Sequence, residues 1–252
     1  TTNKDIAAEA VNVFETLSLG QFVEDSKYLL VAPLEMKHRF LALIDDEIEA
    51  ANNGEPARVV AKMNGLSDKD IIDKLIEASQ AGVKITMYIR GICCMRAGVP
   101  GLTENITIKS MVGRFLEHPR VFLFGYGERE HLYIGSADWM TRNLNYRVEV
   151  AVEILDKEVK ATIFDVLDII SKDNMLARVQ QPDGTYKRVY PQEGEKKIDS
   201  QREQFEMFKR LREETSCIEH EVRSRTVIED ENVPEAIVKQ AAVSRVKARV
   251  EQ

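Results

Sequence analysis

The sequence predicts an α/β fold: a mixed β-sheet with helices on both faces, followed by a helical tail at the C-terminus. Between residues 28 and 90, apolar strand segments alternate with amphipathic helical segments, and strands joined by whole helices pair in parallel. Between residues 120 and 154, three apolar segments follow one another closely, which favours antiparallel pairing. A composition of 44% hydrophobic and 31% charged residues agrees with a globular domain.

The first segment, "TTNKDIAAEAVNVFETL", predicts an amphipathic helix capped by Asn3 or Asp5. It enters this helix within a few residues and has no initiator methionine, so we expect the chain to be cut from a longer protein. We therefore interpret residues 1–25 as a remnant of a preceding domain, packed on a body that is partly missing.

The main domain is expected over residues 26–190. Its first strands are "YLLVAP", "ARVVAKM", "VKITMYIR" and the short "ITIKSM". The first three alternate with the helices "MKHRFLALIDDEIEAANNG" and "SDKDIIDKLIEASQAG", the second of which has Ser67 and Asp70 in a capping-box arrangement and Gly82 as its stop. We expect parallel pairing among these strands.

The strands "RVFLF", "HLYIGS" and "RVEVAVEI" then form the antiparallel part, and the helix "DKEVKATIFDVLDIISKD" closes the unit. A hairpin follows, turned at Pro182, Asp183 and Gly184. Residues 191–252 are highly charged and predict a helical tail, with helices over 202–214 and 234–250, that serves as a flexible or interaction segment.

Charge and cysteine content narrow the function classes. A net charge of −7 argues against a nucleic-acid partner, although a local basic pocket for a small polyanion stays open. Cys93 and Cys94 are adjacent, a poor geometry for a disulfide, which favours a reducing cytoplasm. The sequence also contains no apolar run of transmembrane length.

Basic side chains and one histidine gather at predicted strand ends. Lys62 and Arg90 end two strands that are expected to be parallel, and ligands bind at the carboxyl ends of such strands. Gly135 and Ser136 end another strand and form a small-residue corner that lets backbone N–H groups approach an anion. With His118 nearby, this set indicates a phosphate site rather than a metal site.

Other interpretations of His118 and of the two adjacent cysteines stay open. His118 precedes Pro119, and a histidine there can simply satisfy a local hydrogen bond. Cys93 and Cys94 could be nucleophilic, but no paired base is evident.

Several longer sequence segments resemble known protein families. "HPRVF" followed by "YIGSADW" resembles a degenerate phospholipase D motif, in which His-x-Lys and Gly-Ser-x-Asn build a phosphoryl-transfer pocket. "GVKITMYIRGICC", "PGLTENITIKSMVGRFLEH" and "YIGSADWMTRNLNYRVEV" resemble the second, phospholipase D-like C-terminal domain of polyphosphate kinases, over about residues 1–190.

This resemblance implies reversible transfer of the ATP γ-phosphate to inorganic polyphosphate through a phosphohistidine, with magnesium bound mainly by residues outside this chain. The nucleophilic histidine would lie upstream, so the chain alone should be inactive. His118 matches the second histidine of the family, which could donate or accept a proton or stabilise charge, and Arg90 matches its phosphate-binding arginine. A homo-oligomer in the full enzyme and a cytoplasmic location, with peripheral membrane association left open, are also expected.

Three positions depart from the superfamily pattern. Arg120 replaces the lysine and offers a fork of donors suited to phosphate, Gly125 stands where an aspartate is expected, and Asp138 replaces the motif's asparagine. These departures weigh against the alternative of an independent phosphodiesterase or nuclease. A non-catalytic interaction module is the other alternative.

Overall fold

The computed structural model describes residues 1–23 and 26–226, and only the backbone of residues 215–226. The chain separates into two compact units, residues 1–197 and residues 198–252. The sequence placed this division after Tyr190. The connecting segment is tied to the first unit because Asn174 Nδ2 donates a hydrogen bond to the Lys196 carbonyl at 2.9 Å. The assignment of residues 1–25 to a preceding domain stays a prediction.

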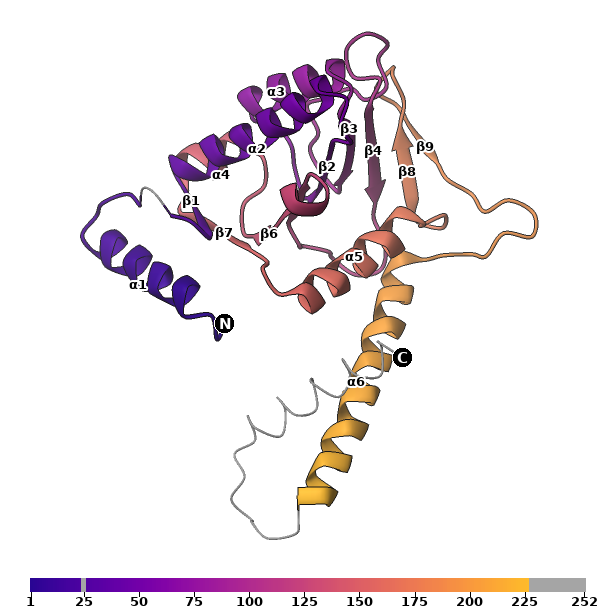
Figure 1. Cartoon of the computed structure of the whole chain (residues 1–252). Helices are drawn as coiled ribbons and strands as arrows, with labels where there is room; N and C mark the ends of the chain where they lie inside the picture. The colour runs from indigo at the N-terminus through magenta and orange to yellow at the C-terminus, as the bar shows by residue number, and fades with distance from the viewer. Residues whose placement is uncertain (24–25, 227–252) are drawn as a thin grey trace. The chain divides into compact units, whose positions relative to one another are not determined.

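The described part of the first unit contains a nine-stranded sheet in the order β1-β7-β6-β5-β2-β3-β4-β8-β9 (Figure 1). The strands are β1 (Leu29–Ala32), β2 (Arg58–Met63), β3 (Lys84–Ile89), β4 (Ile106–Met111), β5 (Val121–Phe124), β6 (His131–Gly135), β7 (Glu149–Glu153), β8 (Ala177–Gln180) and β9 (Tyr186–Arg188). Strands β2, β3 and β4 pair in parallel and the other neighbours pair antiparallel, so the predicted mixed sheet is confirmed.

The expected parallel pairing of the first strand is wrong. Strand β1 pairs antiparallel with β7, with Leu30 opposite Ala151, and does not contact β2. The connecting helix carries the chain past β7, β6 and β5 before β2 begins. A whole-helix connection fixes the direction of the next strand, but not how many places along the sheet that strand is inserted.

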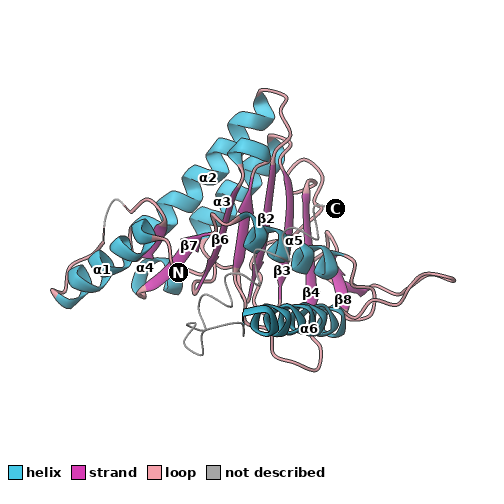
Figure 2. Ribbon diagram, turned by 60° about the horizontal axis from the view of Figure 1, so that its bottom comes forward, coloured by secondary structure: helices cyan, strands magenta, loops and turns pink. Residues whose placement is uncertain are grey.

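Helices cover both faces of the sheet, as predicted (Figure 2). Along β2, Val59 and Ala61 belong to the core formed with α2 (Glu35–Asn52), α3 (Lys69–Gln80) and the short α4 (Thr141–Tyr146). Val60 points to the opposite face, where it packs in the two clusters formed with α5 (Lys157–Ser171). This alternation is the period of a strand buried on both faces.

An aromatic cluster fixes the loops beside the site. The Phe40 ring lies 4.7 Å from Phe122 and 5.7 Å from Trp139, centroid to centroid, and all three side chains are fully buried. The Trp139 carbonyl accepts hydrogen bonds from the Ser67 and Asp68 amides at 2.9 and 3.1 Å. The loop after β6 is thereby held against the loop after β2.

The predicted cap of α3 is wrong by one residue. Asp68, not Ser67, is the N-cap, and its carboxylate accepts a hydrogen bond from the Ile71 amide at 3.2 Å. The Asp68 carboxylate also pairs with Lys37 at 3.1 Å. Gly82 follows the end of the helix as expected, at a φ of 98°.

Helix α1 (Lys4–Ser18) is capped by Asn3, whose side-chain oxygen accepts hydrogen bonds from the amides of residues 5 and 6. Its Ile6 and Val13 pack on Leu29 and Val31 of β1. The Glu9 carboxylate accepts hydrogen bonds from the amides of residues 27, 28 and 29 at 3.0, 2.9 and 3.0 Å. One side chain thus binds the start of the edge strand.

The predicted hairpin is confirmed between β8 and β9, with Gly184 at a φ of 86° in its turn. In the second unit, α6 (Ser200–Thr226) confirms the helix expected over residues 202–214. The helix expected over residues 234–250 lies outside the described residues. Across the described ranges, none of the helices combines the length and the apolar character that a membrane span would need.

Candidate active site

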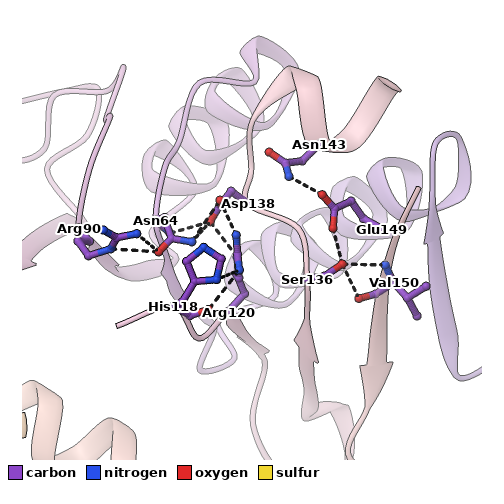
Figure 3. A network of polar contacts seen from close by, with 9 residues as sticks. All are labelled: Asn64, Arg90, His118, Arg120, Ser136, Asp138, Asn143, Glu149 and Val150. Atoms are coloured by element: carbon purple, nitrogen blue, oxygen red, sulfur yellow. Dashed lines mark hydrogen bonds and ion pairs between the residues drawn. The ribbon is translucent and has the colours of Figure 1, made fainter. Parts of the chain in front are cut away.

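Figure 3 shows four of the predicted phosphate-binding residues, Arg90, His118, Arg120 and Ser136, at one edge of the sheet. Arg90 follows β3, and Asn64 follows the parallel neighbour β2. His118 and Arg120 precede β5, which runs antiparallel to β2, so the amino end of β5 lies at the carboxyl end of β2. Gly135 ends β6, the next strand along.

Asp138 is the centre of the polar network. It is 6% exposed, and its carboxylate accepts hydrogen bonds from Arg120 Nε at 3.2 Å and from Arg120 Nη2 at 3.0 Å. The backbone amide and the side-chain amide of Asn64 donate to it at 2.7 and 3.0 Å. Burial raises the pKa of Asp138, and the hydrogen bonds from Arg120 and Asn64 lower it. The lowering is larger, so the pKa lies below its ordinary value.

Arg120 is committed to protein partners. Besides the carboxylate fork, its Nη1 lies 2.6 Å from His118 Nδ1 and 3.2 Å from the His118 carbonyl. Of the five N–H groups of an arginine, only one, on Nη2, is then left. Both arms of the guanidinium fork hold Asp138 in this structure, and phosphate binding by Arg120 stays a prediction.

Arg90 has the donors that Arg120 lacks. Its Nε and Nη2 donate to Asn64 Oδ1 at 3.1 and 2.8 Å. These bonds use two of its five N–H groups, and within the described residues the other three make no hydrogen bond. The side chain is half-buried, so Arg90 is oriented by Asn64 and still presents charge and donors at the edge of the sheet.

Lys62 is neutralised within the protein. Its ammonium lies 2.6 Å from the carboxylate of Glu117, and the two side chains are 7% and 16% exposed. This ion pair joins β2 to the segment that carries the exposed His118. Direct phosphate binding by Lys62, as the sequence suggested, would require Glu117 to release it.

The anion-binding role predicted for Gly135 and Ser136 stays a prediction, because both backbone amides already donate to carbonyl groups of the protein. The Gly135 amide donates to the Arg120 carbonyl at 3.2 Å, and the Ser136 amide donates to the Val150 carbonyl at 3.0 Å. Gly135 has another function, since a Cβ there would lie 2.8 Å from the Cβ of Ala151. It allows β6 and β7 to approach closely.

The sequence interpretation missed Asn64, which belongs to the Asp138 network, and Glu149 and Asn143, which form a separate cluster with Ser136. Asn64 holds both Arg90 and Asp138, and its place directly after a strand was the signal that could have found it. Glu149, 9% exposed, accepts hydrogen bonds from the Ser136 hydroxyl and from Asn143 Nδ2. No sequence motif marked Glu149 or Asn143.

The described residues offer little to metal or thiol chemistry. Among the side chains described, those of residues 1–23 and 26–214, no group of three or more from histidine, cysteine, aspartate and glutamate is placed to hold a metal ion. Cys93 and Cys94 are free thiols. Burial raises the pKa of Cys93, which disfavours the thiolate that a nucleophile needs.

Arg90, which keeps donors for a ligand, the buried Asp138 and the exposed His118 define an α/β domain with a polar, cationic site at the ends of its central strands. The family model described as "Polyphosphate kinase C-terminal domain 2" matches residues 29–201. The chain belongs to this family.

Known proteins with similar sequences are polyphosphate kinases, in agreement with the family match. A polyphosphate kinase of Bacillus anthracis is 44% identical over 207 residues, covering 82% of this chain and 29% of the relative. One of Thermosynechococcus vestitus is 46% identical over 192 residues, covering 76% of this chain and 26% of the relative. The crystal structure of polyphosphate kinase from Porphyromonas gingivalis superposes with a TM-score of 0.79 at 35% identity, covering 84% of this chain and 33% of that chain. The chain thus spans about a third or less of these relatives.

Proposed function

We propose that this chain supplies one half of the active site of a polyphosphate kinase, which transfers the ATP γ-phosphate reversibly to inorganic polyphosphate. The observation that carries the proposal is Arg90, with three uncommitted N–H groups at the edge that also holds His118. A guanidinium fixed in this way can donate paired hydrogen bonds to the oxygens of a phosphate chain. Its charge also stabilises the charge that develops during phosphoryl transfer.

The attacking group is proposed to lie in the part of the protein that precedes this chain, as a histidine that becomes phosphorylated. In the described residues, His118 is the histidine that belongs to this polar network, and its Nδ1 is held by Arg120. A ring held in that way is suited to assisting transfer between other groups. We therefore expect the chain alone neither to hydrolyse ATP nor to extend polyphosphate.

Magnesium would enter with the nucleotide and would be held mainly by groups outside this chain. The Asp138 carboxylate already accepts five hydrogen bonds from Arg120 and Asn64. Magnesium requires freely available oxygen ligands in near-octahedral geometry. When bound, it would neutralise charge on the phosphate oxygens.

The test compares this chain with a version extended upstream, each incubated with ATP labelled in its γ-phosphate. We expect acid-labile phosphohistidine in the extended protein and none in the chain alone. A matched pair with His118→Gln in both proteins shows whether labelling involves His118. Acid-labile label on the wild-type chain, lost in His118→Gln, would refute the assignment of the nucleophile to the upstream part.

A further inference from the structure

We propose that Asp138 is a positioning residue that acts through Arg120: it holds the guanidinium so that His118 accepts a hydrogen bond at Nδ1, carries its ring proton on Nε2, and works as a hydrogen-bond donor to a phosphoryl oxygen. The role toward phosphate rests on the proposed function. The arrangement of the three side chains does not.

The first step is the contact between Arg120 Nη1 and His118 Nδ1 at 2.6 Å. An arginine N–H can only donate a hydrogen bond, so Nδ1 must accept with its lone pair. In the neutral ring, the proton then sits on Nε2. An N–H on Nδ1 would face the guanidinium N–H directly, and two donors cannot form a hydrogen bond with each other.

The second step is that Asp138 fixes this guanidinium. The carboxylate accepts from Nε at 3.2 Å and from Nη2 at 3.0 Å, which sets both the position and the plane of the group. The Arg120 and Asp138 side chains are 11% and 9% exposed, so water competes little for these bonds. Nη1 has no other orientation in this plane than toward the His118 ring and carbonyl.

The chemistry of His118 follows from the position of its proton. Its Nε2 has no lone pair for attack on phosphorus, and its Nδ1 lone pair is engaged by Arg120. Loss of the Nε2 proton would produce an imidazolate, which is too basic to form near neutral pH. His118 can therefore donate a hydrogen bond without transferring a proton, as a neutral electrophilic histidine does.

This inference changes the meaning of the replacement at position 138. In the sequence, Asp138 in place of an asparagine was a departure that weighs against an independent phosphodiesterase. An asparagine offers one oxygen and one NH₂ group, and the NH₂ group would oppose one arm of the guanidinium. A carboxylate is the side chain that accepts from both arms. Arg120 and Asp138 are thus a matched pair.

The test reads the His118 ring directly, in the full 252-residue chain labelled with ¹⁵N-histidine. Long-range ¹H–¹⁵N spectra distinguish the Nε2–H form, the Nδ1–H form and the doubly protonated ring by which nitrogen carries the proton. His118→Gln assigns the signals among the other histidines. We expect the wild-type chain at neutral pH to show His118 as a single Nε2–H form, and an Nδ1–H form or a doubly protonated ring would overturn the proposal.

The variant Asp138→Asn tests the positioning role, with Asp173→Asn as the matched control. Asp173 is also buried, at 2% exposed, and accepts hydrogen bonds from the amides of residues 175–177. We expect Asp138→Asn to replace the single form by exchange between the two neutral forms, and Asp173→Asn to leave it unchanged. An unchanged His118 pattern in folded Asp138→Asn would refute the role of Asp138.

A second variant covers the case in which Asp138→Asn does not fold. Arg120→Lys keeps the charge, but a single ammonium cannot hold the carboxylate and the His118 ring in one plane. We expect loss of the single Nε2–H form in this variant too, and its persistence would refute the proposal. Addition of inorganic tripolyphosphate tests the role of His118 toward phosphate separately from the arrangement of the three side chains. A single Nε2–H form that does not shift with tripolyphosphate would leave the side-chain arrangement standing and would count against the phosphate role.

Discussion

Replacing Arg90 by lysine should weaken polyphosphate binding more than it weakens the fold. In the protein, Arg90 spends two N–H groups on Asn64 Oδ1 and keeps three for a ligand. Lysine keeps the charge but loses the fork. A hydrogen bond to a charged group contributes about 1.5–3 kcal/mol, so losing one such bond to phosphate should raise the Kd about ten- to hundredfold.

The effect on stability should be smaller. The two bonds to Asn64 share one acceptor in a half-buried position, and a net hydrogen bond contributes about 1 kcal/mol. For a domain of this size, that amounts to a shift in Tm of about 2–4 °C. The assay is calorimetry with tripolyphosphate, paired with thermal melts. The salt concentration is held fixed and low, because polyanion affinity depends on salt. Arg178→Lys, an exposed substitution in β8, is the control. Unchanged affinity with a large drop in Tm would make Arg90 a structural residue and refute the reasoning.

Three further predictions follow from the site and the sheet. In the full-length enzyme, His118→Ala should lower kcat by ~10²–10⁴, measured as polymer formed from ATP, and a parent rate would exclude His118 from the reaction. The depressed pKa of Asp138 contributes stability that is fully present above the unfolded-state value of about 3.9 and is lost as the pH falls through the folded-state value. Urea unfolding should therefore show Asp138→Asn less stable than wild type by about 3–5 kcal/mol at pH 7, with a smaller difference at about pH 3; an equal difference at both would contradict this. Gly135→Ala should cost about 1–3 kcal/mol, because the added methyl would lie 2.8 Å from Ala151 Cβ; an unchanged urea midpoint would show that β7 gives way easily.

The sequence predicted the elements well because their patterns are local. Apolar periodicity located the strands of the sheet and the helices between them, and the helix-joined strands β2 and β3 pair in parallel as expected. The place of β1 could not be predicted in this way. Its pairing with β7 joins segments more than a hundred residues apart, and no local signal specifies that partner.

In the site, too, the features that follow from local sequence could be predicted and the long-range contacts could not. The rule that ligands bind at strand ends found Arg90, and the family resemblance found His118 at the same edge. The partners of Arg120 could not be predicted, because a guanidinium serves a ligand or a protein carboxylate equally well until its neighbours are known. Asp138 supplies that carboxylate from a loop that Trp139 fixes against the end of β2.

The contact between Glu9 and the start of β1 also has a consequence for the outer edge of the sheet. Strand β1 is an outer strand of the sheet, and an outer strand with open amides is a template for pairing with another chain. Glu9 occupies the amides of residues 27–29 with a carboxylate, and α1 lies beside them. Helix α1 therefore covers amides that could otherwise pair with a strand of another chain.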